Sequence, residues 1–461
     1  MEKPVVSVSC PPGPAAEILQ RFAPSFQASN GITVKIKTRA PETVPDPGTD
    51  LWVVEPALMP SMAASGKLRA VPENLTAPNG DYSWHTILPV YRSKLLIWDQ
   101  ESFALPLADE AMLCFYRTDL LSDPKNRTDF KAKYGRELTA PATWQDIERI
   151  AEFFQGKLRP GLDRACSSLT ALPKDDDGLD RLYYLIAAPF VRQAMNEYKV
   201  TKTSPRELFS FHYDVDTGKP LLHTAGFVAA LDMLCRLQPY RAGAGSDPYQ
   251  SFADGEAVIC FAPVPAIARF QKSATTKNRF AVARPPGSEI VYGFDQGKPA
   301  ASVGINEVPY LGATGAVMVV PESSQNARDA FGLAAYLSNP KTSRDIVTDP
   351  AWGGGVFRSE HLAVGMGWGS FGLGAGQTED LIKILRETYV HTQISNPLLR
   401  LRIPDQASHR AVVLRELRAA LFSEKKPAEA MQDADKAWLR LDAKMTPAER
   451  LATYRLSVNL R

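Results

Sequence analysis

The segment that decides the fold is Asp50-Leu51-Trp52-Val53-Val54 (DLWVV), a short apolar run behind a single acidic residue. Apolar runs of this length with β-branched and aromatic side chains are typical of strands buried on both faces, as in parallel sheets. Glu55-Pro56 follows directly, and proline ends strands because it has no amide hydrogen for the sheet. The segment therefore predicts a buried strand of a parallel sheet, with Glu55 at its carboxyl end.

The residues around this strand supply its neighbours. Val5–Cys10 alternates valine and serine and predicts another strand, closed by Pro11-Pro12-Gly13-Pro14. A helical pattern of apolar residues then runs to Asn30-Gly31, and Ile32–Ile36 alternates with a period of two. After DLWVV, a second helix ends at Ser65-Gly66. This order of strands and helices predicts an α/β fold with a parallel sheet flanked by helices.

The carboxyl ends of these strands form the expected ligand-binding edge. In open α/β sheets, ligands bind beyond the carboxyl ends of the parallel strands. Pro12 and Gly13 follow the first strand, and Glu55 follows DLWVV. These three residues are therefore candidate ligand-binding residues.

The remainder of the chain also alternates strand and helix patterns. Further strands are expected at Phe103–Pro106, Met112–Tyr116, Ala257–Phe261, Phe280–Ala283 and Ala316–Val320. Helices are expected at Trp144–Phe154, Leu182–Met195, Ala225–Leu237 and Ala327–Leu337, with three more helical patterns at the end. Thr143 is the expected N-cap of the Trp144–Phe154 helix. The glycine-rich stretch 353–376 is expected to form an ordered loop or a mobile lid.

Composition restricts the class of protein. The chain has 461 residues, and at about 100–200 residues per domain this length predicts two or three domains or one two-lobed unit. Apolar residues make up 44% and charged residues 23%, which argues against a disordered chain. The 53 basic and 51 acidic side chains give a net charge of +2, which argues against a nucleic-acid partner. No apolar run approaches the roughly 18 residues of a transmembrane helix.

Motifs for metal binding and catalysis are missing from the sequence. The five cysteines have no C-x-x-C spacing and the six histidines are dispersed, which argues against a zinc site. Buried thiols are the simpler interpretation of the cysteines, and a disulfide is the alternative. The run Lys174–Gly178 (KDDDG) lacks the ligand spacing of a calcium loop and is interpreted as a solvated acidic loop. Neither G-x-S-x-G nor a Walker motif occurs, and no cofactor is expected.

Two other features bear on chemistry and location. Asp109-Glu110 lies between two strands, but adjacent residues point in different directions, so a joint catalytic role is disfavoured. A hydrolytic carboxylate pair drawn from distant positions stays open. Met1–Pro4 leads directly into the first strand without the basic and apolar segments of a secretory signal. Either the protein is cytoplasmic or the sequence is a mature form.

The order of these segments resembles the extracellular solute-binding proteins of family 1, the maltose-binding-protein-like receptors of ABC importers. The similarity runs from about Val5 to the last helices. It rests on five motifs in family order, namely Thr49–Val54 with Met62–Leu68, Leu105–Leu121, Pro141–Ile147, Phe252–Ile259, and Gly315–Pro321 with Ala327–Leu337. Leu105–Leu121 is similar to the first crossing between the two lobes of the family, and Ala262-Pro263-Val264 lies at the expected second crossing.

The resemblance implies a two-lobed periplasmic-binding-protein-like fold of type II, in which each lobe is a mixed sheet flanked by helices. The boundaries it suggests are 1–110 plus about 262–314 for lobe 1, and 111–261 plus about 315–461 for lobe 2. The ligand would lie in a cleft between the lobes that closes by hinge motion.

Site residues also follow from the resemblance. Asp109-Glu110 lies where relatives place a carboxylate that binds sugar hydroxyls, and Glu110 is the stronger candidate of the two. Pro263 belongs to the expected second crossing, where Val264 stands in place of the tryptophan that stacks on sugar in relatives. Tyr292 or Trp352 is the expected replacement for that ring, because an aromatic face covers the C–H face of a sugar. Packing beneath a loop is the alternative for both rings.

These inferences predict a substrate-binding receptor for an ABC-type importer, which binds a carbohydrate or similar polyol reversibly and is not an enzyme. The expected partners are a small-molecule solute and the membrane subunits of an ABC transporter, with no nucleic acid, and the expected state is a monomer. The resemblance implies a periplasmic or extracellular location, with a membrane anchor as an option in the full-length form. Two alternatives stay open: a carboxylate-dependent glycosidase-like hydrolase, and a sensor or scaffold module that retains the fold.

Overall fold

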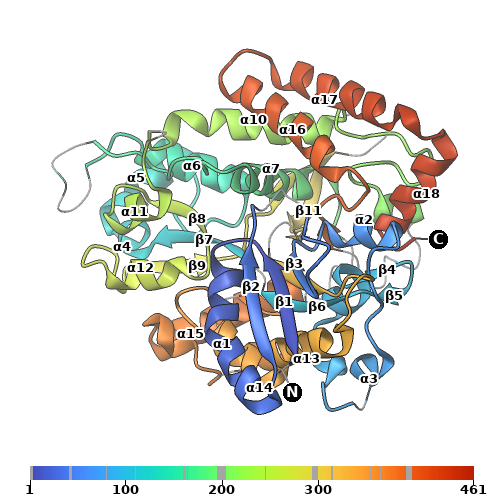
Figure 1. The fold of residues 1–461 in the computed structure, drawn as a ribbon. Coiled ribbons are helices and arrows are strands. Elements are labelled where there is room, and N and C mark those ends of the chain that lie inside the picture. Colours follow the sequence, from blue (N-terminus) through green and yellow to red (C-terminus); the bar gives the residue numbers. More distant parts are fainter. Residues whose placement is uncertain are drawn as a thin grey trace.

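The computed structural model describes residues 4–40, 44–78, 80–108, 111–158, 162, 165–194, 204–243, 245–292, 299–312, 315–353, 355–363, 365–390 and 397–460. These residues form two α/β lobes, one built on a five-stranded sheet and the other on a three-stranded sheet. The first lobe lies below the second in Figure 1, and the chain begins in the lower lobe. The predicted two-lobed α/β fold is confirmed.

The first sheet has the strand order β2-β1-β3-β13-β6. Its members are β1 (Val5–Cys10), β2 (Thr33–Thr38), β3 (Leu51–Val54), β6 (Ala104–Ala108) and β13 (Ala316–Val319). β1 pairs in parallel with β2 and β3, whereas β13 runs antiparallel to β3 and β6. DLWVV forms β3, and all four residues of this strand are buried because it has a neighbour on each side and packing on both faces.

Helix α1 (Pro14–Asn30) links β1 to β2, and α13 (Ala327–Ser338) packs against α1, β3 and β6. Gly13 precedes α1 with a φ of 92°, a conformation that side chains with a Cβ rarely adopt. Pro14 opens the helix, where no amide donor is needed. Gly31 ends it in the left-handed region. The chain can therefore reverse sharply at the carboxyl edge of the sheet.

The second sheet has the strand order β8-β7-β9. Its members are β7 (Met112–Arg117), β8 (Ile259–Pro263) and β9 (Phe280–Ala283), and β7 is antiparallel to both neighbours. Leu169 forms a parallel bridge to Ile259 at the outer edge.

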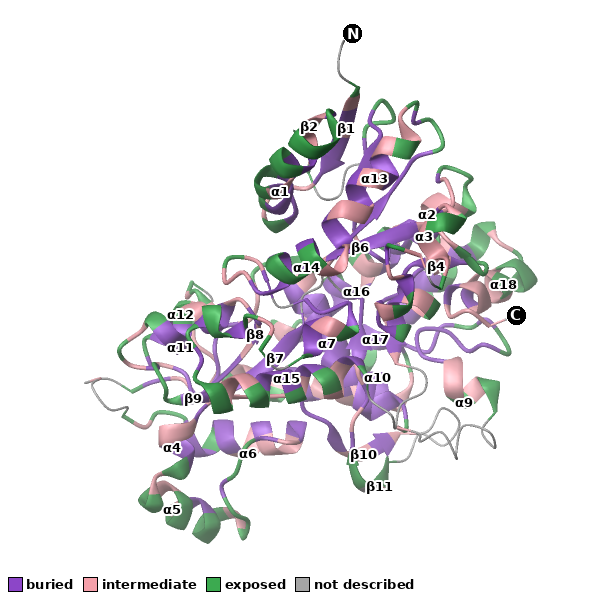
Figure 2. Ribbon diagram, turned by 90° about the horizontal axis from the view of Figure 1, so that it is seen from below, coloured by how far each residue is buried: buried purple, intermediate pink, exposed green. Residues whose placement is uncertain are grey.

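Helix α7 (Asp176–Val191) packs against α10 (Ala225–Arg236) and α16 (Gln406–Leu421), and residues 178–191 of α7 are all buried. Figure 2 shows this contrast between buried α7 and the largely exposed α5 (Pro124–Tyr134).

The other elements complete the two lobes. The remaining helices are α2 (Met59–Ala64), α3 (Glu73–Thr76), α4 (Thr118–Ser122), α6 (Trp144–Phe154), α9 (Pro205–Phe209), α11 (Pro248–Ala253), α12 (Ala266–Lys272), α14 (Pro340–Val347), α15 (Ala375–Tyr389), α17 (Pro427–Leu441) and α18 (Pro447–Ser457). The remaining strands are β4 (Ile97–Trp98), β5 (Glu101–Ser102), β10 (Ser288–Tyr292), β11 (Pro299–Asn306), β12 (Tyr310–Leu311) and β14 (Leu398–Leu399). Short 3-10 or π turns occupy 84–86, 91–95, 238–240, 359–362, 368–371 and 442–444.

The chain passes between the lobes after β6, after β12 and after α15. The second and third of these passages lie side by side, because β12 and β14 pair in parallel, with Tyr310 opposite Leu398 and Leu311 opposite Leu399. The expected second crossing at Pro263 is wrong, since β8 is followed by α12 and then by β9 in the same sheet.

The strand pairings also contradict the expected boundaries of 262–314 for lobe 1 and 315–461 for lobe 2. β9 pairs with β7 in the second sheet, and β13 lies between β3 and β6 in the first. Both strands are short and apolar, so their sequence pattern identifies them as buried strands without identifying their partners.

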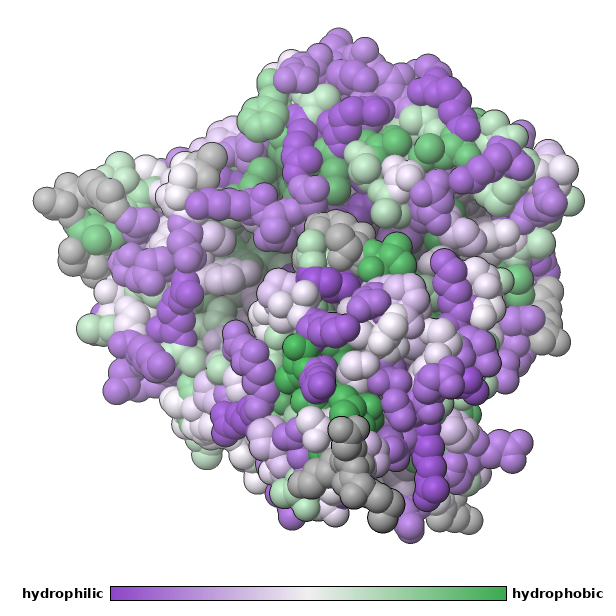
Figure 3. All heavy atoms as spheres, viewed as in Figure 1, coloured by the Kyte–Doolittle hydropathy of each residue, from purple (hydrophilic) through white to green (hydrophobic). Residues whose placement is uncertain are grey.

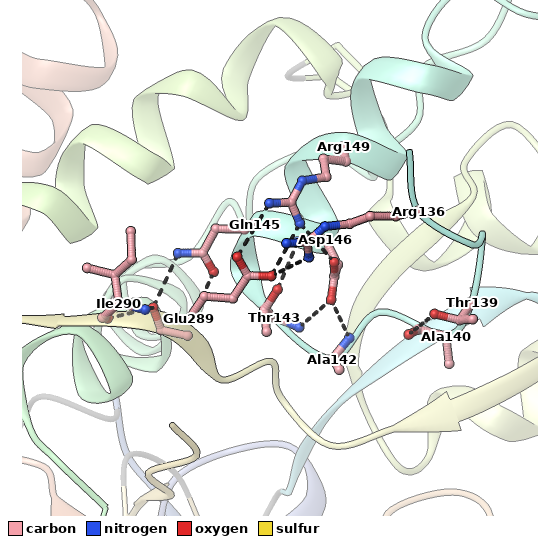
Figure 4. Close-up of polar contacts among 11 residues, drawn as sticks. Arg136, Thr139, Ala140, Ala142, Thr143, Gln145, Asp146, Arg149, Glu289 and Ile290 are labelled. Carbon is pink, nitrogen blue, oxygen red and sulfur yellow. Dashed lines mark hydrogen bonds and ion pairs between the residues drawn. The ribbon is translucent and has the colours of Figure 1, made fainter. Parts of the chain in front are cut away.

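Helix α6 begins at the predicted N-cap, Thr143. The Thr143 hydroxyl accepts a hydrogen bond from the amide of Asp146 at 3.1 Å, and the Asp146 carboxylate accepts one from the amide of Thr143 at 3.1 Å. The same end of the helix is tied to β10, where Arg136 and Arg149 both approach the Glu289 carboxylate (Figure 4). Local capping and this tertiary contact thus stabilise the same helix start.

Three smaller expectations can be compared with the described residues. The five cysteines are free and four of them are buried, as the simpler interpretation predicted. The described part of 353–376 is an ordered loop whose Trp368 and Phe371 are buried with their ring centroids 5.7 Å apart. The KDDDG run is not a solvated loop, because Asp175 accepts a hydrogen bond from the amide of Gly178 at 2.6 Å and caps α7.

Candidate functional site

The carboxyl edge of the first sheet brings three polar side chains together. Cys10 ends β1, Arg39 follows β2, and Glu55 follows β3. Arg39 donates from Nη2 to the carbonyl oxygen of Val53 at 2.8 Å, and its amide donates to the carbonyl oxygen of Cys10 at 3.0 Å. Arg39 therefore ties the ends of the three parallel strands together, and the predicted position of Glu55 at this edge is confirmed.

The first turn of α7 supplies acidic groups from the second lobe. Asp177 lies in this turn, and Asp180 follows three residues later with only 3% of its side chain exposed. The cap formed by Asp175 sets the direction of the helix. The acidic run therefore presents carboxylates in a defined direction.

Arg400 links the carboxyl edge of the first sheet to the first turn of α7. It follows β14 on the third passage between the lobes, and its Nη1 donates to Glu55 Oε2 at 3.0 Å. Its Nη2 donates to Asp177 Oδ1 at 3.1 Å, and its Nε lies 3.7 Å from Asp180 Oδ2. Arg410 of α16 approaches Asp177 at 2.5 Å. These five residues, Glu55, Asp177, Asp180, Arg400 and Arg410, are called the Arg400 cluster below.

Exposure within the Arg400 cluster is uneven. The side chain of Arg400 is 3% exposed, whereas those of Glu55 and Asp177 are 29% and 39% exposed. A carboxylate has about four acceptor positions, so each of these two keeps positions for a further donor. The buried guanidinium therefore holds two partly open carboxylates, one from each lobe.

The electrostatics of the cluster follow from burial. Burial raises the pKa of Glu55, and the Arg400 charge opposes this rise. Burial also raises the pKa of Asp180, again against the charges of Arg400 and Arg410. For Arg400, burial lowers the pKa, but the charges of Asp180 and Glu55 outweigh it and the pKa is raised. Arg400 is therefore a permanent cation that favours the ionised form of its neighbours.

A cavity of about 350 Å³ lies beside the same segment of the second lobe. Its lining includes Met112, Thr170, Lys174, Arg241, Tyr249 and Phe261. Loop 170–175 forms part of this wall and leads directly into the first turn of α7. Pro263, a predicted site residue, pairs with Met112 in the β7–β8 register and so lies next to the cavity wall.

The other predicted site residues fall into two groups. Pro12 is exposed and Gly13 precedes α1, so both lie at the carboxyl edge with Cys10 and Glu55. Asp109 and Glu110 lie outside the described residues.

Tyr292 and Trp352 are not brought to this site. The Tyr292 ring lies 6.2 Å from the ring of Phe190, near the far end of α7 from Asp177. Thirteen residues of α-helix span about 20 Å, so this ring is remote from the cluster. The Trp352 ring lies 5.5 Å from the guanidinium of Arg21, in the middle of α1. Both rings instead pack against the body of their lobes, the alternative interpretation.

The sequence did not identify Arg39, Arg400 or Arg410 as site residues. It also did not predict that Asp177 and Asp180 contact Arg400. The acidic run was visible as a motif, but its direction depends on the start of α7. Arg400 follows the apolar pair Leu398-Leu399 with no local motif around it. Arg400 is recognised as a site residue only through its hydrogen bond to Glu55, which lies 345 residues away in the sequence.

Two features are absent from the residues that the structure describes. No group of three or more His, Cys, Asp or Glu side chains within them has the arrangement of a metal site. None of the helices in the described part of the chain is long and apolar enough to cross a membrane.

The fold of this chain is similar to those of several solved structures of solute-binding proteins. A solute-binding protein of an ABC transporter from Agrobacterium radiobacter, in complex with ribitol, is 15% identical, with a TM-score of 0.68 over 95% of this chain and 98% of that chain. One from Thermotoga lettingae, bound with α-D-tagatose, is 17% identical, with a TM-score of 0.64 over 95% and 99%. A maltose-bound protein of T. maritima is 18% identical, with a TM-score of 0.63 over 95% and 99%. At these identities, the likeness is one of fold.

The family is given by a sequence comparison. The model of the bacterial extracellular solute-binding proteins matches residues 23–358, which is more than half of the chain. A comparison with curated proteins gives no match. The match spans β3, β7 and α7, and so includes both the carboxyl edge and the opposing helix. The chain therefore belongs to the bacterial extracellular solute-binding proteins, which bind small-molecule solutes for ABC transporters and are not enzymes.

Proposed function

We propose that this protein captures a carbohydrate or similar polyol in the cleft between its lobes and presents it to the membrane subunits of an ABC importer. The observation that carries the proposal is the pair of partly open carboxylates, Glu55 and Asp177, held from opposite lobes by the buried Arg400. Carboxylates accept hydrogen bonds from hydroxyl groups, so a polyhydroxylated ligand can bond to both lobes at once.

The relatives support this class of ligand. The structures compared above hold ribitol, tagatose and maltose, and each ligand carries several hydroxyl groups. Hydrophilic residues also dominate the face in Figure 3, on which both lobes are visible. A ligand with several hydroxyl groups suits this local group of hydrogen-bond acceptors, Glu55 and Asp177.

Closure of the two lobes would complete the site. The paired strands β12 and β14 lie where the chain passes between the lobes, and Arg400 follows β14 directly. A ligand that contacts both lobes favours the conformation in which both sets of contacts are made. The proposed hinge is therefore this pair of passages together with the one between β6 and β7.

Several finer assignments belong to the proposal. Pro12 and Gly13 would border the ligand at the sheet edge, and Pro263 would border it beside Met112. Asp109 and Glu110 remain proposed acceptors on sequence grounds. The protein would act in the periplasm or outside the cell, as other members of this extracellular family do, and we propose that it acts as a monomer.

The first step of the test is a thermal-shift screen over sugars and polyols. A ligand present at about 100 times its dissociation constant should stabilise the fold by about 2.7 kcal/mol. The strongest ligand is then titrated by calorimetry. Turnover of the ligand during incubation would contradict the proposal, as would stabilisation by none of these compounds and none of the matched sugar acids.

Three variants test the site itself. Glu55→Gln and Asp177→Asn should each weaken binding by about 1.5–3 kcal/mol, because each loses a hydrogen bond to a charged acceptor. Asp176→Asn is the matched control, since Asp176 pairs with the exposed Arg418 instead of Arg400. Unchanged affinity in both Glu55→Gln and Asp177→Asn, measured calorimetrically with the wild-type ligand, would remove the cluster from the site.

A further inference from the structure

The cavity beside loop 170–175 is rich in positive charge. Its lining includes three cations, Lys174, Arg241 and Arg269, and two carboxylates, Asp175 and Asp247. The surplus of one positive charge lies on the second lobe, next to the helix that carries Asp177. The hydrogen bonds and ion pairs of these five side chains show which of their charges are free to bind a ligand.

Both carboxylates are already engaged. Asp175 accepts from the amide of Gly178 at 2.6 Å as the cap of α7. Asp247 caps α11 by accepting from the amide of Tyr249 at 2.9 Å, and it also pairs with Arg269 at 3.1 Å. The Arg269 charge is therefore offset within the protein.

Arg241 and Lys174 are bonded only to neutral groups. Arg241 donates from Nη1 to the carbonyl oxygen of Thr170 at 3.3 Å, and Lys174 donates to the carbonyl oxygen of Gly245 at 3.1 Å. Nε and Nη2 of Arg241 are buried and have no hydrogen-bond partner among the described residues. No ion pair is recorded for either side chain in the part of the chain that the structure describes.

A buried cation without a counter-ion is costly, because it loses hydration without gaining an ion pair. Burial lowers the pKa of Arg241 to about 10, so the guanidinium is still charged at neutral pH. Guanidinium groups bind carboxylates in a planar, two-bonded geometry. The wall of the cavity thus contains a positive charge that no carboxylate of the described residues neutralises.

We propose that the solute carries a carboxylate, as in a sugar acid, and that Arg241 with Lys174 forms the subsite for this group. This inference rests on the proposed function and narrows its ligand class. Loop 170–175 leads from this cavity to Asp177, so the hydroxyl groups of the same solute would extend along the loop toward the Arg400 cluster. A cavity of about 350 Å³ is large enough for a solute of this size.

The test compares neutral compounds with their matched acids by calorimetry. Suitable pairs are glucose with glucuronate, galactose with galacturonate, and ribitol with ribonate. The acid should bind at least about tenfold more tightly than its neutral partner in at least one pair, as a charge-assisted hydrogen bond gives. Arg241→Gln should abolish this preference for the acid, and Arg241→Lys should retain part of it.

Controls separate the two proposals. Lys174→Gln should reduce the preference for the acid several-fold, whereas Arg236→Gln should leave it unchanged, since Arg236 pairs with Glu148 elsewhere in the lobe. Circular dichroism and thermal unfolding verify that each variant is folded. If neutral sugars bind and the acids bind equally or worse, the acid subsite is wrong and the receptor function stands. If a folded wild-type protein binds neither class, both proposals fail.

Discussion

His212 and His361 are buried, and burial lowers the pKa of each side chain to about 3. His361 bonds to the hydroxyl of Ser343 through Nε2 at 2.9 Å, whereas Nε2 of His212 has no partner among the described residues. Both imidazoles are therefore neutral in the folded chain at pH values where an unfolded chain begins to bind protons. Stability is coupled to pH at these single positions.

The pH dependence of His212 can be tested directly. In the unfolded chain this group binds a proton near pH 6.5, but in the folded chain only near pH 3. The contribution of neutral His212 to the free energy of unfolding is therefore fully present above about pH 6.5. It falls as the pH is lowered, and about 2 kcal/mol is lost by pH 5. Between pH 7 and pH 5, the free energy of unfolding measured in urea should fall by about 2 kcal/mol less in His212→Leu than in the wild type. The exposed His85, replaced by Leu, is the control, and an equal loss in His212→Leu would contradict the prediction.

Thr143 is a second position where one side chain carries measurable free energy. Thr143→Ala removes the hydroxyl acceptor for the amide of Asp146, which then lacks its partner at the start of α6. We expect the free energy of unfolding to fall by about 1 kcal/mol. Thr143→Ser keeps the acceptor and should stay close to the wild type in denaturant unfolding. Equal stability of the Ala and Ser variants would show that the contacts of Glu289 in Figure 4 hold this helix start alone.

At the scale of elements, the segment 397–402 connects several parts of the molecule. β14 pairs with β12, and Arg400 then reaches the ends of β3 and α7. Arg402 donates to the carbonyl oxygens of Leu95 and Ile97, both at 3.2 Å. Burial lowers the pKa of Arg402 to about 9. Six consecutive residues thus contact the carboxyl edge of the first sheet, the first turns of α7 and strand β12 near the passage between the lobes.

Arg400 tests the importance of this segment. Arg400→Met removes the buried cation shared by the three carboxylates of the Arg400 cluster, but Arg410 still pairs with the two aspartates. Breaking a fully buried ion pair costs about 3–5 kcal/mol, and the remaining Arg410 charge reduces this cost to about 2–3 kcal/mol. We expect the free energy of unfolding to fall by this amount. Arg418→Met is the control, since it breaks an ion pair whose two side chains are 43% and 53% exposed and should cost under about 1 kcal/mol. A similar loss in both variants would contradict the structural role of the cluster.

At the scale of the whole molecule, two lobes share one chain that passes between them repeatedly. The first sheet contains strands from residues 5–108 and 316–319, and the second contains strands from 112–117 and 259–283. The first sheet is therefore discontinuous in sequence, whereas the strands of the second sheet all lie within residues 112–283. The proposed closure would be a rotation of the lobes about these passages, in the manner of a hinge.

The hinge predicts a change of shape on binding. Small-angle X-ray scattering should give a smaller radius of gyration when the solute found in the thermal-shift screen is saturating, because a ligand that contacts both lobes favours the closed form. Asp177→Asn should reduce this compaction at equal ligand concentration, and Asp176→Asn should not. An unchanged radius of gyration at saturation would contradict hinge closure.

Much of the local structure could be predicted because it depends on neighbours in sequence. The strand Val5–Cys10, the helix from Pro14 to Asn30 and the start of α6 at Thr143 all lie where periodicity and capping placed them. The position of Glu55 at a strand end could be predicted for the same reason. The two-lobed arrangement could be predicted because the family motifs occur along the chain in the order found in the family.

The tertiary structure alone decided which segments meet. β13 and β9 have similar apolar patterns, yet they joined opposite sheets, because a strand's partner depends on which sheet edge is open to it. Glu55 became part of a site only through Arg400, which lies 345 residues away. Periodicity reports which face of an element is apolar, whereas long-range contacts depend on how those faces and charges pack together. The sequence by itself therefore determined the elements and the class of fold, and packing in space assembled the Arg400 cluster and the cationic cavity.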